Sequence, residues 1–421
     1  MAAELDFSTL NQCAKCGACT SVCPIYRVTG RESLTARGKH HLISRLSASK
    51  RSSAYPDIIS KCLLCGACND VCPRFLDTPA LVITARHKLG CFEDTYFAKK
   101  LISQKALLHL GLVSRFIKTA GRVNEILIKN LPADSGLRLR LLEFAGQWIL
   151  PVTSERYAVS RLKAGPAQGN PDLSYFTGCA ADYLFPEIGS ANEMLLQKGC
   201  GSSLDVPATQ ACCGLAAQAG GDLKLAKKLA KTNIAAFEAN SLPIFTSCAS
   251  CYSHLITYPD LLKDDHDWKN RAIHFAGRLK EFSTYFVNSM EFKARCEKIF
   301  NGTGSVKRRV VYHDPCHLKF GLKITEAPRR LIARFPGIEL MELPHGSQCC
   351  GHGGLFNLLH PGLSHDIRNR LIADFESLGA DTVVTTCSGC LLQWRQGLAA
   401  AKSAAKATHL GIFLAKMYAA E

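Results

Sequence analysis

Cysteine constrains this chain more than any other residue, because 21 of its 421 residues are cysteines and 18 of these fall into regularly spaced sets. Disulfide-rich chains are mostly short and secreted. This chain is long, and its first ten residues, MAAELDFSTL, lack the basic and apolar stretches of a signal peptide. Clustered cysteines in such a chain favour metal or cluster binding in a reducing compartment.

Two motifs near the N-terminus share the spacing C-x2-C-x2-C-x3-C-P, one over residues 13–24 and one over residues 62–73. This spacing is typical of two-cluster bacterial ferredoxins, in which the fourth cysteine of each motif binds the other cluster. We therefore predict a first [4Fe–4S] cluster on Cys13, Cys16, Cys19 and Cys72. We predict a second [4Fe–4S] cluster on Cys62, Cys65, Cys68 and Cys23. A zinc ribbon is the alternative, but it would supply its ligands as two separated pairs.

Ten further cysteines form two sets with the same order and nearly the same spacing. The first set is Cys179, Cys212, Cys213, Cys248 and Cys251, and the second is Cys316, Cys349, Cys350, Cys387 and Cys390. The second set follows the first by 137 residues for three members and by 139 for the last two. This repetition predicts a duplicated unit.

Apolar runs precede the cysteines of both sets, at residues 173–176, 242–246, 309–312 and 382–385. Helical patterns lie between these runs, as at residues 222–238 and 365–378. Such alternation of strands and helices predicts an α/β fold in each unit. The cysteines would then follow the strands, in the crevice where open α/β sheets bind ligands.

The two repeated sets, each with a Cys-Cys-Gly sequence at 212–214 and 349–351, resemble the CCG domain of heterodisulfide reductase subunits and related proteins. With the two ferredoxin-type motifs, the layout resembles the iron–sulfur subunits of glycolate oxidase and D-lactate dehydrogenase. The resemblance implies one or two further, non-cubane [4Fe–4S] clusters held by the five cysteines of each unit. Some glycolate oxidase subunits lack the last C-x2-C, whereas this chain retains all ten cysteines, which weakens a strict assignment. A vestigial or zinc-bound site is the alternative.

We therefore predict an α+β multidomain protein with four segments. A helical two-cluster ferredoxin-type domain would occupy residues 1–90, a basic amphipathic helical linker 91–170, the first CCG unit 171–300 and the second CCG unit 301–421. The linker could lie on a membrane surface, dock a partner, or simply pack with a solvated polar face. A Pro/Gly-rich stretch at residues 163–171 marks its end.

Several residues near the repeated sets are candidates for lesser roles. Four histidines could donate hydrogen bonds or protons around the second CCG cluster, or merely pack there: His313, His317, His345 and His352. Cys91, Cys200 and Cys296 lie outside every motif and are expected to be ordinary thiols. The formal net charge of +16 suits an acidic partner or an anionic surface, or is merely a basic surface.

The family resemblance implies an electron-transfer subunit that passes electrons between the flavin of an FAD-containing 2-hydroxyacid dehydrogenase and a quinone or other carrier. An electron-transfer flavoprotein is another partner of this kind. The alternatives are a catalytic subunit that cleaves a disulfide at a CCG cluster, or the iron–sulfur subunit of anaerobic glycerol-3-phosphate dehydrogenase or of an electron-transfer-flavoprotein:quinone oxidoreductase. No dinucleotide fingerprint or nucleic-acid reader is evident, so we expect no intrinsic flavin or NAD and no nucleic acid. Without an apolar run of about 20 residues, we expect a cytoplasmic or peripheral membrane location.

Overall fold

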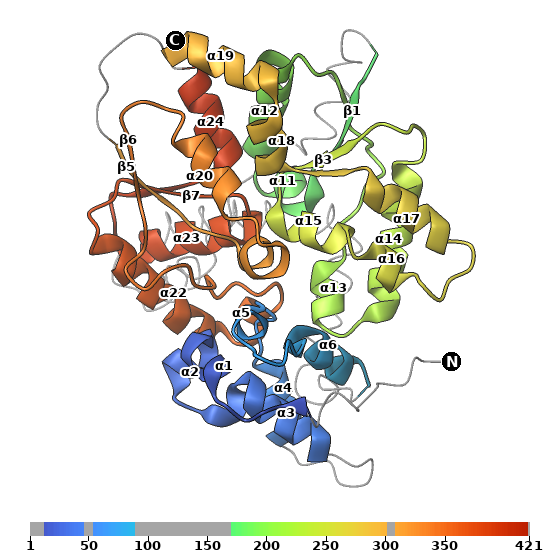
Figure 1. The fold of residues 1–421 in the computed structure, drawn as a ribbon, viewed down its shortest axis with the longest axis vertical. Helices are drawn as coiled ribbons and strands as arrows, with labels where there is room; N and C mark the ends of the chain where they lie inside the picture. Colours follow the sequence, from blue (N-terminus) through green and yellow to red (C-terminus); the bar gives the residue numbers. More distant parts are fainter. Residues whose placement is uncertain (1–11, 46–53, 89–169, 301–307, 420–421) are drawn as a thin grey trace, which may run out of the picture.

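Two parallel sheets organise the C-terminal part of the chain in this computed structural model, which describes residues 12–45, 54–88, 170–300 and 308–419 (Figure 1). The first sheet has the order β2-β1-β3-β4 and the second the order β6-β5-β7-β8. The strands are β1 (Leu173–Phe176), β2 (Leu204–Asp205), β3 (Ile244–Thr246), β4 (Leu279–Glu281), β5 (Arg308–Tyr312), β6 (Ile338–Met341), β7 (Thr382–Thr385) and β8 (Lys406–His409). Equal strand orders in the two halves confirm the predicted duplication.

Helices connect the strands of each sheet. The first unit contains α11 (Gly178–Tyr183), α12 (Pro186–Met194), the π-helical η3 (Leu195–Cys200), α13 (Leu215–Ala219), α14 (Leu223–Ala236), α15 (Ala249–Leu255), α16 (Tyr258–Leu261), α17 (Lys269–Gly277), α18 (Phe282–Asn288) and α19 (Met290–Phe300). The second contains the π-helical η4 (His317–Leu322), α20 (Glu326–Ile332), α21 (Phe356–Leu359), α22 (Pro361–Glu376), α23 (Ser388–Ala400) and α24 (Leu410–Ala419). The strands and helices predicted in both units are therefore confirmed.

Helix α14 illustrates why these segments fold as they do. Its apolar residues recur every three or four positions, so that Leu225, Leu229 and Ile234 share one buried face. The side chain of Asp222 caps the helix by accepting a hydrogen bond from the backbone N–H of Leu225 at 3.0 Å. The buried face packs into an apolar core that also includes side chains of the second unit, such as Trp394.

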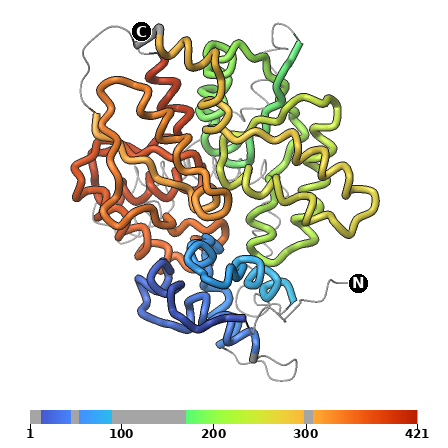
Figure 2. The backbone as a smooth tube through the Cα atoms, in the orientation of Figure 1, coloured from blue at the N-terminus to red at the C-terminus, as the bar shows by residue number. Residues whose placement is uncertain are grey.

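The two units pack side by side (Figure 2). Helix α12 of the first unit packs on α24 of the second, and α20 of the second packs on α18 of the first. Inside each unit a buried tyrosine hydroxyl on the first strand bonds a hydroxyl just after the third. These pairs are Tyr175 with Ser247 at 2.9 Å and Tyr312 with Thr386 at 3.0 Å. Both large apolar cores contain residues of both units, which joins the units into one body.

Short helices form the N-terminal part, which lies against both units (Figure 1). They are α1 (Ala18–Val22), α2 (Pro24–Thr29), the 3-10 turn η2 (Glu32–Leu34), α3 (Ala36–Arg45), α4 (Ala54–Ser60), α5 (Ala67–Asp70) and α6 (Thr78–Lys88). Helix α2 packs on α22, and α5 packs on η4. The mixture of helices with parallel sheets agrees with the predicted fold class. The predicted linker at 91–170 lies outside the described residues, apart from its last residue.

Arg86 of α6 ties the N-terminal helices to the first unit. Its buried guanidinium donates to the carbonyls of Ile59, Ser60 and Cys62, and also to the carbonyl of Ala219 at 2.6 Å. Next to it, the ring of His87 bonds the carbonyl of Gly221 at 2.9 Å. One cation thus satisfies buried carbonyls on both sides of the interface. Within the part of the chain that the structure describes, no helix is long and apolar enough to cross a membrane.

Replacing Arg86 tests this interface. Arg86→Met should lower the free energy of unfolding by about 2–4 kcal/mol, because it leaves several buried carbonyls without hydrogen-bond donors. The melting temperature of the anaerobically purified protein should therefore fall by several degrees. The exposed residue Lys88 is the matched control. Lys88→Met removes the same charge and should change the free energy of unfolding by no more than about 0.5 kcal/mol. Equal melting temperatures for the two variants would contradict this role of Arg86.

Candidate metal centres

A pocket in the N-terminal part is lined by five cysteines, together with α1 and α3. These are Cys13, Cys16, Cys19, Cys68 and Cys72. Gly17 precedes α1 with a left-handed φ of 83°, which turns the first motif around the pocket. Four of the five sulfurs are those predicted for the first cluster, and Cys72 reaches them from the second motif.

A second pocket is lined by the cysteines predicted for the second cluster. They are Cys23, Cys62, Cys65 and Cys68. Gly66 repeats the left-handed turn of Gly17, with a φ of 78°. Cys68 lines both pockets, so the two sites are neighbours. The exchange of Cys23 and Cys72 between motifs is the arrangement that the spacing predicted, while metal ligation at these positions stays a prediction.

Lys39 lies against the second pocket with its side chain almost completely buried, at 1% exposure. Its ammonium donates to the carbonyl of Leu34. Burial lowers the pKa of Lys39, while the nearby thiols of Cys62 and Cys23 raise it. A buried cation here would offset the negative charge of a thiolate-bound cluster. This role could not be predicted from the sequence, because Lys39 stands in a helix among other basic residues.

The chemistry of both pockets fits iron–sulfur clusters. The side chains that could bind a metal ion in these pockets are predominantly thiols. No carboxylate lines either pocket, which disfavours hard cations such as Mg²⁺ and Ca²⁺. Burial raises the pKa of Cys23 to about 11. Such a thiol keeps its proton unless a metal ion displaces it.

The five cysteines of the first unit contact one another in a row. Cys212 lies between Cys179 and Cys213, and Cys251 lies between Cys213 and Cys248. Cys179 lies at the start of α11, just after β1, and Cys248 and Cys251 lie at the start of α15, just after β3, at the carboxyl edge of the first sheet. Cys212 and Cys213 lie in the loop before α13. Gly214 completes the Cys-Cys-Gly turn with a φ of 95°, and a Cβ there would lie 3.4 Å from Nε2 of His254.

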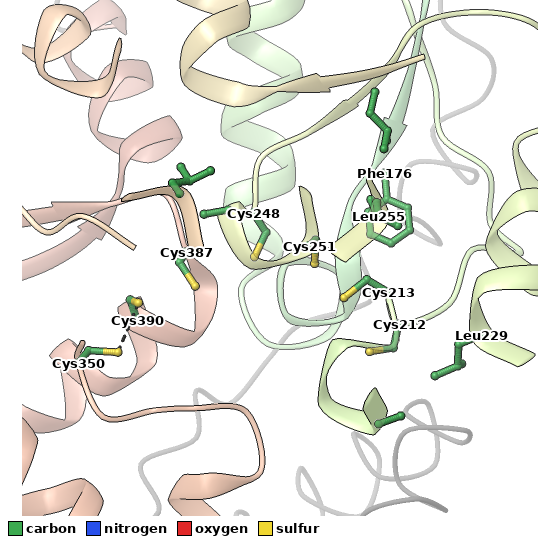
Figure 3. Packing of buried hydrophobic residues seen from close by; sticks show 14 of the residues in the cluster. Phe176, Cys212, Cys213, Leu229, Cys248, Cys251, Leu255, Cys350, Cys387 and Cys390 are labelled. Carbon is green, nitrogen blue, oxygen red and sulfur yellow. Dashed lines mark hydrogen bonds between the residues drawn. The ribbon is translucent and has the colours of Figure 1, made fainter. Parts of the chain in front are cut away.

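The second unit repeats this arrangement. Cys349 contacts Cys316 and Cys350, the sulfurs of Cys350 and Cys390 lie 3.3 Å apart, and Cys390 contacts Cys387. Gly351 has a φ of 84°, and a Cβ there would meet the carbonyl oxygen of Ser364 at 2.9 Å. Each unit therefore gathers its predicted set of five sulfurs. Figure 3 shows Cys212, Cys213, Cys248 and Cys251 of the first unit beside Cys350, Cys387 and Cys390 of the second.

Contacts between thiols prepare some sulfurs to ionise. Hydrogen bonds from Cys179 and Cys213 lower the pKa of Cys212 well below its usual value. Hydrogen bonds from Cys349 and Cys390 do the same for the pKa of Cys350. Among the described residues no cysteine forms a disulfide. Five mutually accessible thiols exceed the four that a cubane needs and suit a larger, opened cluster.

Two contacts that the sequence did not predict join the cysteine sets into one line. Cys248 of the first unit contacts Cys387 of the second. Cys65 of the second ferredoxin-type motif contacts Cys349 of the second unit. Ser250, between Cys248 and Cys251 in the sequence, lies with its hydroxyl 3.2 Å from Cys387 Sγ and 3.1 Å from His317 Nδ1.

The four candidate histidines are placed differently. His313 is buried with Cys350 and Cys390 close by, and one ligand atom from each of the three lies within 4.8 Å of the other two. The ring of His317 forms a hydrogen bond with Ser250. His352 lines a large cavity that the cysteines of both units also line. His345 does not join them: its side chain is 71% exposed and pairs with Asp374 at 3.1 Å.

His254 is a further histidine at the first unit that sequence reasoning missed. It lies on α15, is fully buried beside Cys212, and packs edge-on against Tyr258 with ring centroids 5.6 Å apart. Burial lowers the pKa of His254 to about 4, so its ring is neutral at pH 7. Its position, three residues after Cys251, is the only signal that the sequence offered.

Comparison with known proteins agrees with this geometry. Residues 173–256 and 310–395 match the cysteine-rich CCG domain, and residues 9–76 match the 4Fe-4S dicluster domain. The probable glycolate oxidase iron-sulfur subunit of Bacillus subtilis (strain 168) is 33% identical over 231 residues, which are 54% of this chain and 50% of that protein. Lactate utilization protein A 2 of Bacillus cereus (strain Q1) is 32% identical over 222 residues, which are 52% of this chain and 88% of that protein.

The chain belongs to the lactate utilization protein A family. Lactate utilization protein A of Oceanobacillus iheyensis is similar to the same extent, with 32% identity over 52% of this chain and 86% of that protein. The alignment spans only half the length of the glycolate oxidase subunit. This chain combines a 4Fe-4S dicluster domain with two CCG domains.

Replacing Cys72 tests the exchanged ligand sets. Cys72→Ser should remove the cluster held mainly by the first motif, because the structure places Cys72 with Cys13, Cys16 and Cys19. Iron analysis of the anaerobic protein should show a loss of about four irons per chain. Cys200→Ser is the control, since Cys200 is half-buried beside Ser289, outside both pockets. Loss of the cluster on the second motif instead would contradict the assignment.

Proposed function

We propose that this chain is the iron–sulfur electron-transfer subunit of a flavoprotein 2-hydroxyacid dehydrogenase complex. The partner would carry FAD and oxidise glycolate or D-lactate, and the electrons would pass to a quinone or another carrier. The names of the relatives support this substrate class and the existence of a partner subunit. A cytoplasmic location, or a peripheral one on the inner membrane, is part of the same proposal.

The observation that carries the proposal is the unbroken line of cysteines through the molecule. The two ferredoxin-type pockets share Cys68, and the second of them reaches the second CCG unit through Cys65 and Cys349. The second unit reaches the first through Cys387 and Cys248. The ligand sets thus follow the order first motif, second motif, second CCG unit, first CCG unit.

The two ends of this line are accessible in different ways. At one end Cys16 is exposed, and the apolar side chain of Phe75, three residues after Cys72, is 88% exposed. At the other end Cys179 and Cys212 line a cavity of about 1220 Å³, which extends along the remaining cysteines of both CCG units as far as Cys65. A line of redox sites with accessible ends suits transfer of electrons between two partners better than chemistry on one metabolite.

Iron–sulfur clusters, when bound, accept and release single electrons. The residues of this chain would hold them, exclude water and set their electrostatic surroundings. Lys39 would offset negative charge at the second motif, as its burial against Cys62 and Cys23 indicates. The hydroxyl of Ser250 would donate a hydrogen bond to Cys387. Hydrogen bonds to cluster sulfurs are among the factors that set reduction potentials.

A second candidate function is reductive cleavage of a disulfide at the CCG units. It is favoured by the large cavity, which the cysteines of both units line, and by Lys224, Lys227 and Lys263 on its wall. In that reaction two electrons and two protons convert one disulfide into two thiols. The electrons would arrive from the ferredoxin-type motifs.

Purification under anaerobic conditions separates the two functions. The chain is purified alone and with a co-expressed FAD-containing 2-hydroxyacid dehydrogenase from the same organism. We expect D-lactate or glycolate to reduce the visible absorption of this chain only when the flavoprotein is present. Reduction of a heterodisulfide by the isolated chain with a reduced viologen, without any response to hydroxy acids, would establish the second function instead.

The order of the ligand sets can be tested by electron paramagnetic resonance. In the reduced protein, magnetic coupling between neighbouring clusters broadens their signals and falls steeply with distance. Cys390→Ser in the second unit should sharpen the signal of the cluster on Cys65, because the structure places these sets side by side. Cys251→Ser in the first unit is the matched control and should leave that signal unchanged. The opposite pattern would contradict the proposed order.

A further inference from the structure

The two CCG units differ at one position close to the cysteines. Phe176 stands three residues before Cys179, and His313 stands three residues before Cys316. Phe176 is the last residue of β1 and is part of the apolar core, with its ring 5.9 Å from that of Phe237. The second unit therefore carries an imidazole where the first carries an apolar ring.

His313 is enclosed but lacks polar partners for its side chain. The residue is 1% exposed, and among the described residues neither ring nitrogen has a hydrogen-bond partner. Its backbone N–H donates to the carbonyl of Val384 at 2.8 Å, and its ring packs edge-on against Trp394 with centroids 5.5 Å apart. Buried polar atoms are nearly always paired, and a group that a structure does not contain is one explanation for an exception.

The sulfurs beside His313 are arranged as metal ligands are. Ligand atoms of His313, Cys350 and Cys390 all lie within 4.8 Å of one another, and the two sulfurs lie 3.3 Å apart. Metal–nitrogen bonds of about 2.0 Å and metal–sulfur bonds of about 2.3 Å, in tetrahedral geometry, place nitrogen and sulfur roughly 3.6 Å apart. The ligand atoms of these three residues lie close enough together to hold one metal ion.

We propose that His313 is a nitrogen ligand of the metal centre in the second CCG unit. The second centre would then have a mixed imidazole and thiolate donor set, whereas the first would be bound by thiolates alone. This inference rests on the proposed function only in assigning iron to the centre. With the neutral imidazole of His313 in the place of one of the five thiolates, the second centre is less negative, which raises its reduction potential.

The second centre lies between the ferredoxin-type motifs and the first unit, so its reduction potential affects electron transfer between them. Its cysteines contact the ferredoxin-type motifs through Cys65 and the first unit through Cys248. A higher potential there would hold electrons between the dicluster domain and the first unit. The duplicated unit thus supplies two similar scaffolds with different donors, which separates the potentials of two neighbouring centres.

Pulsed electron paramagnetic resonance of protein labelled with ¹⁵N-histidine tests the ligation directly. The labelled wild-type protein should show a strongly coupled histidine nitrogen. His313→Phe, which installs the residue of the first unit, should abolish that coupling and shift the potential of one centre downward. His254→Gln is the control and should retain the coupling. The second unit has Gln393 at the position that matches His254, so this variant also exchanges a residue between the units.

The remaining outcomes separate this proposal from the proposed function. Absence of a strongly coupled nitrogen in the wild-type protein, or its persistence in His313→Phe, overturns ligation by His313. If the second centre contains zinc, X-ray absorption at the zinc edge replaces the resonance experiment. A nitrogen neighbour that is lost in His313→Phe would then support ligation while contradicting the iron–sulfur assignment. Unchanged signals from the dicluster domain show that His313→Phe has folded.

Discussion

The structure depends on one requirement, which is that sulfur ligands must be brought together before a metal can hold them. Eighteen thiols from distant parts of the sequence lie in sets that contact one another, and eight of them, all in the CCG units, are buried. As ionised thiolates they would repel one another strongly, and burial would add a large desolvation cost. Bound metal compensates both costs. The buried ammonium of Lys39 and the thiol-to-thiol hydrogen bonds reduce them further.

The duplicated α/β unit satisfies this requirement twice. Parallel strands bring the loops that follow them to one edge of a sheet, so cysteines after the first and third strands meet there. Packing the units side by side then sets Cys248 against Cys387. Because the units share their apolar cores, each fixes the position of the other's cysteines. Divergence inside the repeat, at Phe176 and His313, provides the chemical difference that we infer.

Much of this arrangement could be predicted from the sequence, because the spacing of cysteines is a local property. The four ligand groups, the exchange of Cys23 and Cys72, the duplication and the strands before the cysteines all follow from patterns within short segments. The contact between Cys65 and Cys349 could not be predicted in this way, since it depends on how α2 and α5 pack on the second unit. The same holds for Lys39 and Arg86, whose burial is a consequence of tertiary packing. His345 shows the converse, because closeness in sequence to Cys349 did not bring its side chain to the cysteines.

Metal and sulfide analysis of the anaerobically purified chain, combined with Mössbauer spectroscopy, tests whether the eighteen cysteines hold iron–sulfur clusters. We expect about twelve to sixteen irons per chain with matching sulfide, because the two ferredoxin-type sites take about eight and the CCG units take the remainder. We also expect at least one iron–sulfur species that differs from a cubane. Zinc in place of iron, or cystine bridges among these residues, would show that the cysteines do not serve this purpose. A count of about eight irons would confine electron transfer to the dicluster domain and contradict the continuous line of redox sites.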